Sequence, residues 1–255
     1  MGTETGGVQS VQRTLDILAV VQRRGGQVSI GEIATLAGLA LPTTHRLVQT
    51  LVSRGYMRQM PNRSYALGFR LVPLGLAANI FLGADAGPVL SKLVAELGET
   101  ANLAVLSGDQ AEYLAQVPSV HAMRMFTEVG RKVDLHCTGV GKALLSQLPR
   151  DSVRDIIRRV GLTPRTQHTI TTENAMLAEI ELIAERGYAL DEQEQELGVR
   201  CVAMAVPGKL MAPMALSVSG PLSRMTDRFI ERAVPLLSAA VEDFSAGMRS
   251  AGMDR

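Results

Sequence analysis

The chain has 255 residues, of which 46% are hydrophobic and 20% are charged, and its formal net charge is +1 at pH 7. This composition excludes a disordered or fibrous protein, and no run of about 18 apolar residues is present that would cross a bilayer. Its two cysteines are too few for a disulfide framework, and its N-terminus lacks the pattern of a secretory leader. We therefore expect a cytoplasmic protein with two domains and no membrane partner.

The charges are unevenly distributed along the chain. Residues 1–70 contain 8 basic and 3 acidic residues, a net charge of +5, whereas the remaining residues contain 18 and 22, a net charge of −4. A basic segment joined to a mildly acidic body is typical of a protein that binds a polyanion with one part and has another task for the rest. Chance clustering of arginines is the alternative interpretation.

Three short helices are predicted in the basic segment. The first spans residues 10–24, where apolar residues recur at helical spacing before a glycine pair. Its apolar face consists of Val11, Leu15, Leu18 and Val21. Ser29 and Glu32 have the spacing of a capping box, which predicts a second helix. Pro42, as the first residue of a third helix after a stop at Gly38, completes a helix-turn-helix pattern.

The third helix has the composition of a DNA-reading helix. Its apolar face is formed by Thr44, Leu47, Val48 and Leu51. The opposite face is polar without Asp or Glu, and its first turn is where a recognition helix meets base edges. Two short strand-like segments around Pro61-Asn62 then predict a basic wing. The predicted DNA-binding residues are Thr43, Thr44, His45, Arg46, Gln49, Arg54, Arg58 and Arg63.

Other interpretations of this segment remain open. Any compact domain of three helices shows the same periodicity, and His45 suits a surface position without a role equally well. In the DNA-binding interpretation, Arg23 and Arg24 join the arginines at 54, 58 and 63 in contacting phosphates, which gives affinity and salt dependence. The third helix then selects the DNA sequence.

A strongly apolar segment follows, over residues 67–85, but Pro73 interrupts it and it is too short to cross a membrane. We expect a linker helix over residues 71–87. An apolar helix with little chain beside it favours a dimer contact, although packing against the C-terminal domain explains the same composition.

From residue 88 the pattern mixes helices and strands. Residues 90–98 are predicted to be helical, and residues 102–107 and 111–117 form a hairpin around Gly108-Asp109, followed by the segment 123–128. Thr171 or Thr172 caps a later helix that ends at Gly187. Strands over residues 188–191, 200–206 and 214–219 precede a final helix. The expected fold class of this body is α+β.

The stretch LHCTGVGKALL, residues 135–145, has several possible roles. A phosphate-binding loop is excluded because His136 and Ala143 occupy two of its key positions. The four histidines and two cysteines lack the spacing of a zinc site, so no metal or other cofactor is expected. His136 and Cys137 are expected to be packed rather than reactive. Gly139, Val140 and Gly141 lead into a helix from Lys142 and either bind an anion through their N–H groups or serve packing alone.

Three further segments suit the walls of a small cavity. Strand alternation places Ser217 and Ser219 on one face, and Cys201, Ala203 and Ala205 form a row of small side chains. Asp191 ends a strand before the acidic stretch EQEQE, which is expected to be a solvated loop.

The chain resembles the IclR-type (isocitrate lyase regulator) bacterial transcription factors over nearly its whole length. The motifs that carry the resemblance are LALPTTHRLVQTLVSRGY, LHCTGVGKALL, ALDEQEQELGVRCVAMAV and LSVSGPLSRM, in this order. The resemblance implies a winged helix-turn-helix domain over residues 1–70, a linker helix over 71–87, and a GAF-like effector-binding domain over 88–255 with an antiparallel sheet flanked by helices. It also implies homodimers or dimers of dimers.

Within the family, the chain looks most like the glyoxylate-responsive allantoin-pathway repressors. Their effector site maps onto Gly139, Val140, Asp191, Val199, Cys201, Ser217 and Ser219. Val140 replaces an alanine of those proteins. A carboxylate near Asp191 would be repelled unless the ligand also donates a hydrogen bond, which favours a hydrated aldehyde acid or a ureido acid.

The resulting hypothesis is a non-enzymatic repressor of a catabolic operon that binds a palindromic DNA operator and is modulated by a small carboxylate. One alternative is an activator, or a regulator that responds to an aromatic acid. Another is an enzyme that acts on small acids or amides with Cys137 or Cys201 as nucleophile.

Overall fold

The structure is a computed structural model that describes residues 8–75, 86–124, 128–208 and 212–250. The chain forms two compact units, which divide between residues 80 and 81. Residues 71–75 are helical, whereas most of the predicted linker helix lies outside the described residues. The domain limits at residues 70 and 87 therefore stay predictions.

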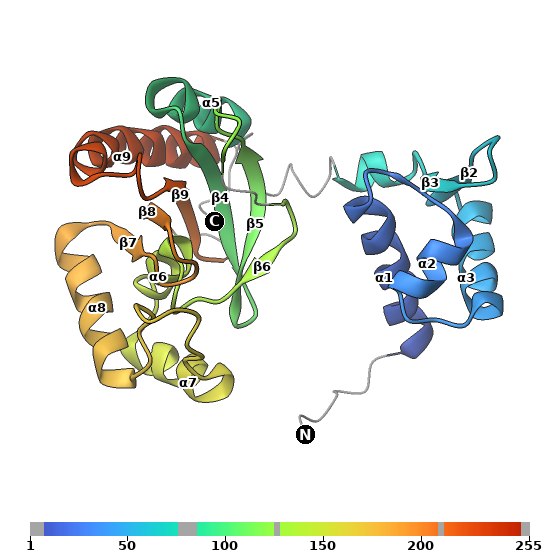
Figure 1. Cartoon of the computed structure of the whole chain (residues 1–255), viewed down its shortest axis with the longest axis horizontal. Coiled ribbons are helices and arrows are strands. Elements are labelled where there is room, and N and C mark those ends of the chain that lie inside the picture. The colour runs from blue at the N-terminus through green and yellow to red at the C-terminus, as the bar shows by residue number, and fades with distance from the viewer. Residues whose placement is uncertain (1–7, 76–85, 125–127, 209–211, 251–255) are drawn as a thin grey trace. The chain divides into compact units, whose positions relative to one another are not determined.

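The N-terminal unit is a winged helix-turn-helix. It consists of α1 (Gln9–Arg23), β1 (Gln27–Val28), α2 (Ile30–Leu36), α3 (Leu41–Ser53), β2 (Met57–Gln59) and β3 (Tyr65–Leu67). The strands form an antiparallel sheet in the order β1-β3-β2, and β2 and β3 are the wing. Figure 1 shows the three helices packed together beside this small sheet. The predicted helix-turn-helix and wing are confirmed.

Local signals in this unit are confirmed with small shifts. Ser29 accepts a hydrogen bond from the amide of Glu32, and the Glu32 carboxylate accepts one from the amide of Ser29, so the capping box is complete. Because α3 begins at Leu41, Pro42 is its second residue rather than its first. Neither position needs an N–H donor, so the proline costs the helix nothing.

The predicted apolar face of α1 is only half right. Val21 is fully buried, but Val11 and Leu15 are 55% and 60% exposed. The buried side chains of α1 all lie in its second half. The first two turns of α1 therefore contribute no side chain to the hydrophobic core formed by the described residues of this unit.

The C-terminal unit is built on a six-stranded antiparallel sheet in the order β6-β5-β4-β9-β8-β7. The strands are β4 (Thr100–Ser107), β5 (Gln110–Val117), β6 (Lys132–Val133), β7 (Ala189–Glu192), β8 (Val199–Val206) and β9 (Met214–Pro221). The helices are α5 (Ala86–Leu97), α6 (Gly139–Leu145), α7 (Arg150–Val160), α8 (Glu173–Arg186) and α9 (Asp227–Ser250). This confirms the α+β class.

Helices cover both faces of the sheet (Figure 1). On one face, α5 and α9 pack on large side chains such as Leu103, Leu216 and Val218. On the other face, α6, α7 and α8 pack over the small side chains Ala104, Ala203 and Ala215. Small residues on this second face let α6 lie close to the sheet, where it forms part of a cavity wall.

Several predicted boundaries of this unit are confirmed. The hairpin turns at Gly108, whose φ of +63° favours glycine. Thr172 rather than Thr171 caps α8, and Gly187 ends it in the left-handed conformation. Helix α7 and the short strands β1 and β6 have no counterpart in the prediction. Residues 125–127 of the predicted segment 123–128 lie outside the described residues.

Among the described residues, no helix is both long and apolar enough to span a bilayer.

Candidate functional site

The exposed face of α3 carries most of the predicted base-reading side chains. His45, Arg46 and Gln49 are exposed, and Thr43 is partly exposed. Thr44 is fully buried, and its hydroxyl donates to the carbonyl of Ala40 at 3.2 Å. The inclusion of Thr44 among the DNA-binding residues was therefore wrong, because its side chain belongs to the core face of the helix.

The wing presents two of the predicted phosphate-contacting arginines. Arg58 is exposed, and its guanidinium lies 4.7 Å from the ring centroid of Phe69. Arg63 occupies the turn with a φ of +64°. The side chain of Asn62 accepts hydrogen bonds from both the amide and the hydroxyl of Ser64, at 3.1 and 2.6 Å, which fixes the turn.

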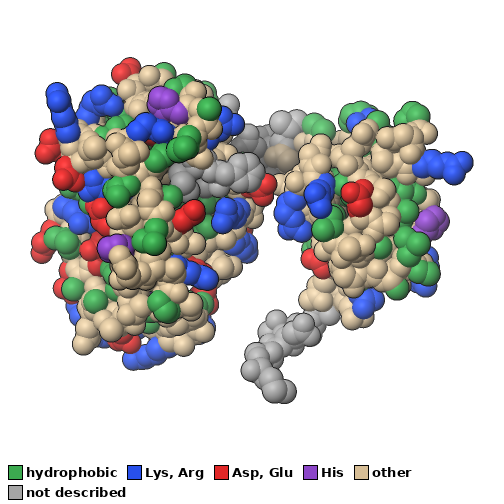
Figure 2. Space-filling model, in the orientation of Figure 1, with side chains coloured by type: hydrophobic (Ala, Val, Ile, Leu, Met, Phe, Trp, Pro, Cys, Tyr) green, Lys and Arg blue, Asp and Glu red, His purple; other side chains and the backbone are tan. Residues whose placement is uncertain are grey.

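Two contacts connect the recognition helix to its surroundings. The amide of Gln49 donates to the hydroxyl of Tyr65 on the wing at 3.5 Å. Exposed Arg54 caps the C-terminus of α3, and its carbonyl accepts a hydrogen bond from Arg70 at 3.3 Å. Basic side chains outnumber acidic ones on the visible face of this unit (Figure 2). The N-terminal unit, called the head below, thus presents a polar helix face and a cationic wing.

A cavity of about 70 Å³ opens in the C-terminal unit beside the start of α6. Its walls include five of the seven predicted effector-binding residues, which are Gly139, Asp191, Val199, Cys201 and Ser219. The strand pairing explains this grouping, since Cys201 lies opposite both Asp191 and Ser219 in the sheet. Residues from four separate segments are therefore brought to one place.

The other two predicted residues do not line the cavity. Val140 is 1% exposed, and its side chain packs into the core between α6 and the sheet. Ser217 is also 1% exposed, and it lies two residues before Ser219 on β9. The Asn102 amide lies 3.4 Å from the Ser217 hydroxyl and 3.5 Å from the Ser219 hydroxyl, which confirms that both serines share a face.

Sequence reasoning missed the remaining walls of the cavity. These are Tyr113, Arg131, Val133, Thr138, Gln195 and Glu196. Tyr113 was placed on the hairpin, but no local signal pointed its side chain at the glycine turn. Arg131 adds a cation to a cavity that otherwise holds two carboxyl groups.

The glycines at the start of α6 have a packing role. A Cβ atom on Gly139 would lie 2.9 Å from the sulfur of Cys201, and one on Gly141 would lie 2.4 Å from the carbonyl oxygen of Leu135. The helix starts at Gly139 rather than Lys142, and Thr138 caps it by accepting the Gly141 amide at 3.1 Å. The packing alternative therefore accounts for Gly141, while Gly139 also lines the cavity.

Asp191 is a buried carboxyl group of the cavity wall with a raised pKa. It is 4% exposed, and its Oδ1 accepts a hydrogen bond from the amide of Glu194 at 2.7 Å. Burial raises the pKa of Asp191 from 3.8 to about 7, against the lowering effect of that hydrogen bond. The negative charge of Glu194 raises it further, whereas Lys142 lowers it.

Both thiols near the cavity are poor nucleophiles. The Cys137 thiol donates to Oε1 of Gln195 at 2.8 Å, and burial raises its pKa to about 12. Burial also raises the pKa of Cys201 to about 12. Thiols that stay protonated at neutral pH react slowly, which speaks against the cysteine-enzyme alternative. The expectation that His136 and Cys137 are packed is confirmed by exposures of 5% and 0%.

Asp134, His136 and Cys137 bring three potential metal-ligand atoms within 4.8 Å of one another. These side chains already have protein partners. Asp134 pairs with Arg165, Nε2 of His136 lies 2.9 Å from the carbonyl of Thr163, and Cys137 binds Gln195. The cluster is thus a set of satisfied polar contacts, which leaves the prediction of no metal site in place.

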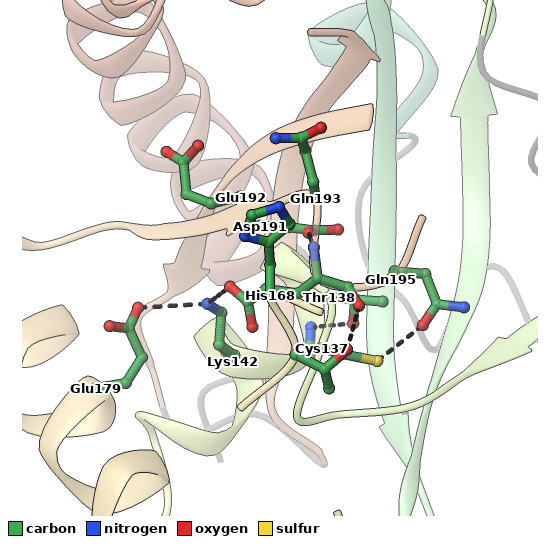
Figure 3. A network of polar contacts seen from close by, with 12 residues as sticks. Cys137, Thr138, Lys142, His168, Glu179, Asp191, Glu192, Gln193 and Gln195 are labelled. Atoms are coloured by element: carbon green, nitrogen blue, oxygen red, sulfur yellow. Dashed lines mark hydrogen bonds and ion pairs between the residues drawn. The ribbon is translucent and has the colours of Figure 1, made fainter. Parts of the chain in front are cut away.

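The prediction that the EQEQE stretch is solvated was wrong for its second glutamate. Glu194 is 4% exposed, and it forms an ion pair with Lys142, which is itself 2% exposed. Figure 3 shows Lys142 reaching Glu179 on its other side, at 3.4 Å. Arg186 completes the chain by pairing with Glu179 at 2.9 Å. Burial of two charges in this way requires mutual neutralisation.

A winged helix-turn-helix unit and a second unit with a small polar cavity define the class of the protein, a DNA-binding transcriptional regulator. The family model described as "IclR helix-turn-helix domain" matches residues 10–61, and "Bacterial transcriptional regulator IclR C-terminal" matches residues 77–246. The chain belongs to the IclR family of bacterial regulators. This confirms the resemblance and the prediction that the protein is a regulator and not an enzyme.

The chain matches curated relatives over most of their length. The acetate operon repressor of Salmonella typhimurium is 38% identical over 93% of this chain and 89% of its own. The transcriptional repressor AllR of Escherichia coli K12 is 32% identical over 89% of this chain and 85% of its own. The acetate operon repressor thus shares more residues with the chain than AllR does.

Solved structures show the same fold. The IclR of Thermotoga maritima superposes with a TM-score of 0.76 at 27% identity, covering 94% of this chain and 98% of that one. An IclR homologue of Microbacterium hydrocarbonoxydans, complexed with 4-hydroxybenzoate, gives a TM-score of 0.79 at 21% identity, covering 95% and 100%.

Replacing Lys142 with methionine is expected to destabilise the C-terminal unit by about 3–5 kcal/mol, because it leaves the carboxylate of Glu194 buried without its cation. Urea unfolding of the full chain measures this. The matched control is Lys92→Met, which breaks the pair with Asp243 on the surface, where the two side chains are 68% and 59% exposed. Equal unfolding midpoints for the two variants would contradict a structural role of the buried pair.

The raised pKa of Asp191 predicts a pH-dependent stability. The folded state favours the protonated acid, so its stabilising contribution is complete below the unfolded value of 3.8 and is lost as the pH rises through about 7. Asp191→Asn cannot ionise and should gain stability relative to the wild type across this window. Thermal melts from pH 4.5 to 8 test this, and curves that stay parallel would show that Asp191 titrates normally.

Proposed function

We propose that the protein is a ligand-responsive transcriptional repressor of a catabolic operon. It binds a palindromic operator in the cytoplasm as a homodimer or a dimer of dimers, and a small carboxylate metabolite modulates the binding. The observation that carries the proposal is the cavity of about 70 Å³, walled by Asp191, Cys201 and Ser219, in a chain that also has a DNA-binding head.

The head supports sequence-specific DNA binding. His45, Arg46 and Gln49 project from the exposed face of α3, and an arginine at that position is suited to hydrogen-bond a guanine edge. Arg54, Arg58 and the wing turn contribute cations for phosphates, which confer affinity without sequence choice.

An apolar stripe supports the homo-oligomer. Val8, Val11 and Leu15 are 67%, 55% and 60% exposed, and their spacing places them on one side of α1. Such a stripe on a small unit favours burial against another chain. A second copy satisfies this, because a palindromic operator requires two heads related by a two-fold axis.

The cavity supports a small acid as the effector. Arg131 supplies a positive charge for a carboxylate, and the hydroxyls of Tyr113 and Ser219 supply hydrogen bonds. Its volume accommodates a molecule of a few heavy atoms, which favours glyoxylate or another acid of the allantoin pathway. The 4-hydroxybenzoate bound by the Microbacterium homologue makes an aromatic acid the second candidate, and a benzene ring requires the cavity to widen.

The relatives support repression as the direction of regulation. The acetate operon protein and AllR are both repressors, so repression is favoured over activation. To shift an operator from mostly occupied to mostly free, the ligand must prefer the released state by about 5.5 kcal/mol. Charge-assisted hydrogen bonds that form only in the released state would supply this preference.

Replacing Arg46 with alanine is expected to weaken binding to the cognate operator by about tenfold or more, because a bidentate base contact is lost. Gel shifts on DNA selected by the wild-type protein from a random pool measure this. Arg158→Ala, an exposed arginine of α7 in the C-terminal unit, is the control and should bind as the wild type does. An unchanged operator affinity of the Arg46 variant would contradict base contacts by this arginine of α3.

Replacing Ser219 with alanine is expected to weaken glyoxylate binding about tenfold while leaving operator affinity near normal, because one hydrogen-bonding group of the cavity is lost. Ser217→Ala is the matched control, since Ser217 lies behind the cavity wall on the same strand. Calorimetry measures ligand binding, and gel shifts measure DNA binding. An equal loss of glyoxylate affinity in both variants would contradict binding of the ligand in this cavity.

A further inference from the structure

Asp191 is surrounded by ionisable groups from every element packed around it. These are Glu194 of the following loop, Lys142 of α6, Cys137 before α6, Cys201 of β8 and Tyr113 of β5, while Arg131 and Glu196 share the cavity wall. Lys142, a buried cation that lowers the pKa of Asp191, is already shared by two carboxylates. Glu179 and Glu194 therefore largely neutralise the charge of Lys142, which leaves little of it to stabilise an ionised Asp191.

The charges on the cavity wall do not accommodate a second anion beside an ionised Asp191. Arg131 contributes one positive charge, and Asp191 and Glu196 contribute two negative charges when both are ionised. A carboxylate ligand would then add a third negative charge. Two carboxylates in one low-dielectric site cannot both remain ionised at little cost, and the usual result is that one of them holds a proton.

Asp191 is able to hold that proton alongside its hydrogen bonds. Its Oδ1 accepts the Glu194 amide at 2.7 Å, and the Gln195 amide is a second backbone donor to the same carboxyl group. Both donors favour the ionised form, but a protonated carboxyl keeps enough acceptor capacity for these contacts. Figure 3 shows Asp191 close to the loop that carries Gln195, above the start of α6. A protonated Asp191 donates an O–H group, whereas an ionised one only accepts.

We propose that the cavity takes up one proton from solvent together with a carboxylate ligand, and that Asp191 receives it. The bound ligand and Asp191 then share an O–H···O⁻ hydrogen bond, in which Asp191 donates and the ligand carboxylate accepts. One O–H bond forms on Asp191, and its proton comes from water or buffer. The proposal rests on the proposed function, because it concerns the effector of that same site.

This assignment changes the class of ligand that the cavity accepts. A ligand need not bring its own hydrogen-bond donor to offset Asp191, so simple oxo acids qualify alongside hydrated aldehyde acids and ureido acids. Because the ligand stays ionised across neutral pH, the proton on Asp191 alone sets the pH dependence of binding. At a fixed ligand concentration, a lower pH gives more complex.

Isothermal titration calorimetry of the full chain with glyoxylate tests the proposal, in phosphate and in HEPES at pH 8, and in acetate and in MES at pH 5.5. The difference in heat between the two buffers counts the protons taken up on binding. We expect about one proton per ligand at pH 8 and close to none at pH 5.5, with affinity falling about tenfold per pH unit above about 7.5. Asp191→Asn should take up none at either pH.

Glu196→Gln is the matched control, because Glu196 also lines the cavity but is exposed. It should retain the proton uptake of the wild type, and loss of uptake in this variant would assign the proton to Glu196. Binding of glyoxylate at pH 8 without proton uptake would overturn the proposal and leave the proposed function intact. If glyoxylate, pyruvate and 4-hydroxybenzoate all fail to bind from pH 5.5 to 8, the proposed function fails and this inference fails with it.

Discussion

The buried ion pair between Lys142 and Glu194 is the interaction on which the cavity depends. Lys142 lies on α6, and Glu194 lies on the loop after β7, 52 residues further along the chain. The pair holds this loop against α6, and the same loop brings the amide of Glu194 to Asp191 and the side chain of Gln195 to Cys137. Without the pair, a buried charge would lose its partner and the loop would lose its anchor.

The close approach of α6 to the sheet is the second constraint. Gly139 and Gly141 lie where a methyl group would meet Cys201 or the backbone at Leu135. Ala203 and Ala215 on the sheet leave room for the helix. Small residues on both sides therefore place the start of α6 beside Asp191 and Cys201, and the size of the cavity follows from how far the helix stands from the strands.

Local sequence signals predicted the elements well, and long-range contacts were where prediction failed. The Ser29–Glu32 capping box, the Gly108 turn and the Thr172 cap each involve residues within a few positions of one another, so spacing alone predicts them. Alternation along a strand also placed Ser219 and Cys201 correctly. Burial of Glu194 was not predictable in this way, because its partner lies on a distant helix and an acidic stretch ordinarily faces water. Tyr113 and Arg131 were missed for the same reason, since strand order brings them to the cavity.

Arg58 and Arg70 connect the wing to the end of α3 and to the residues that follow the wing. Arg58 lies over the ring of Phe69, and Arg70 lies over Tyr56 while its guanidinium donates to the carbonyl of Arg54, the C-cap residue of the recognition helix. Because of these contacts, the recognition helix and the wing keep their relative orientation when the chain after Arg70 moves. In the proposed repressor, a movement of this chain would therefore reorient the recognition helix and the wing together.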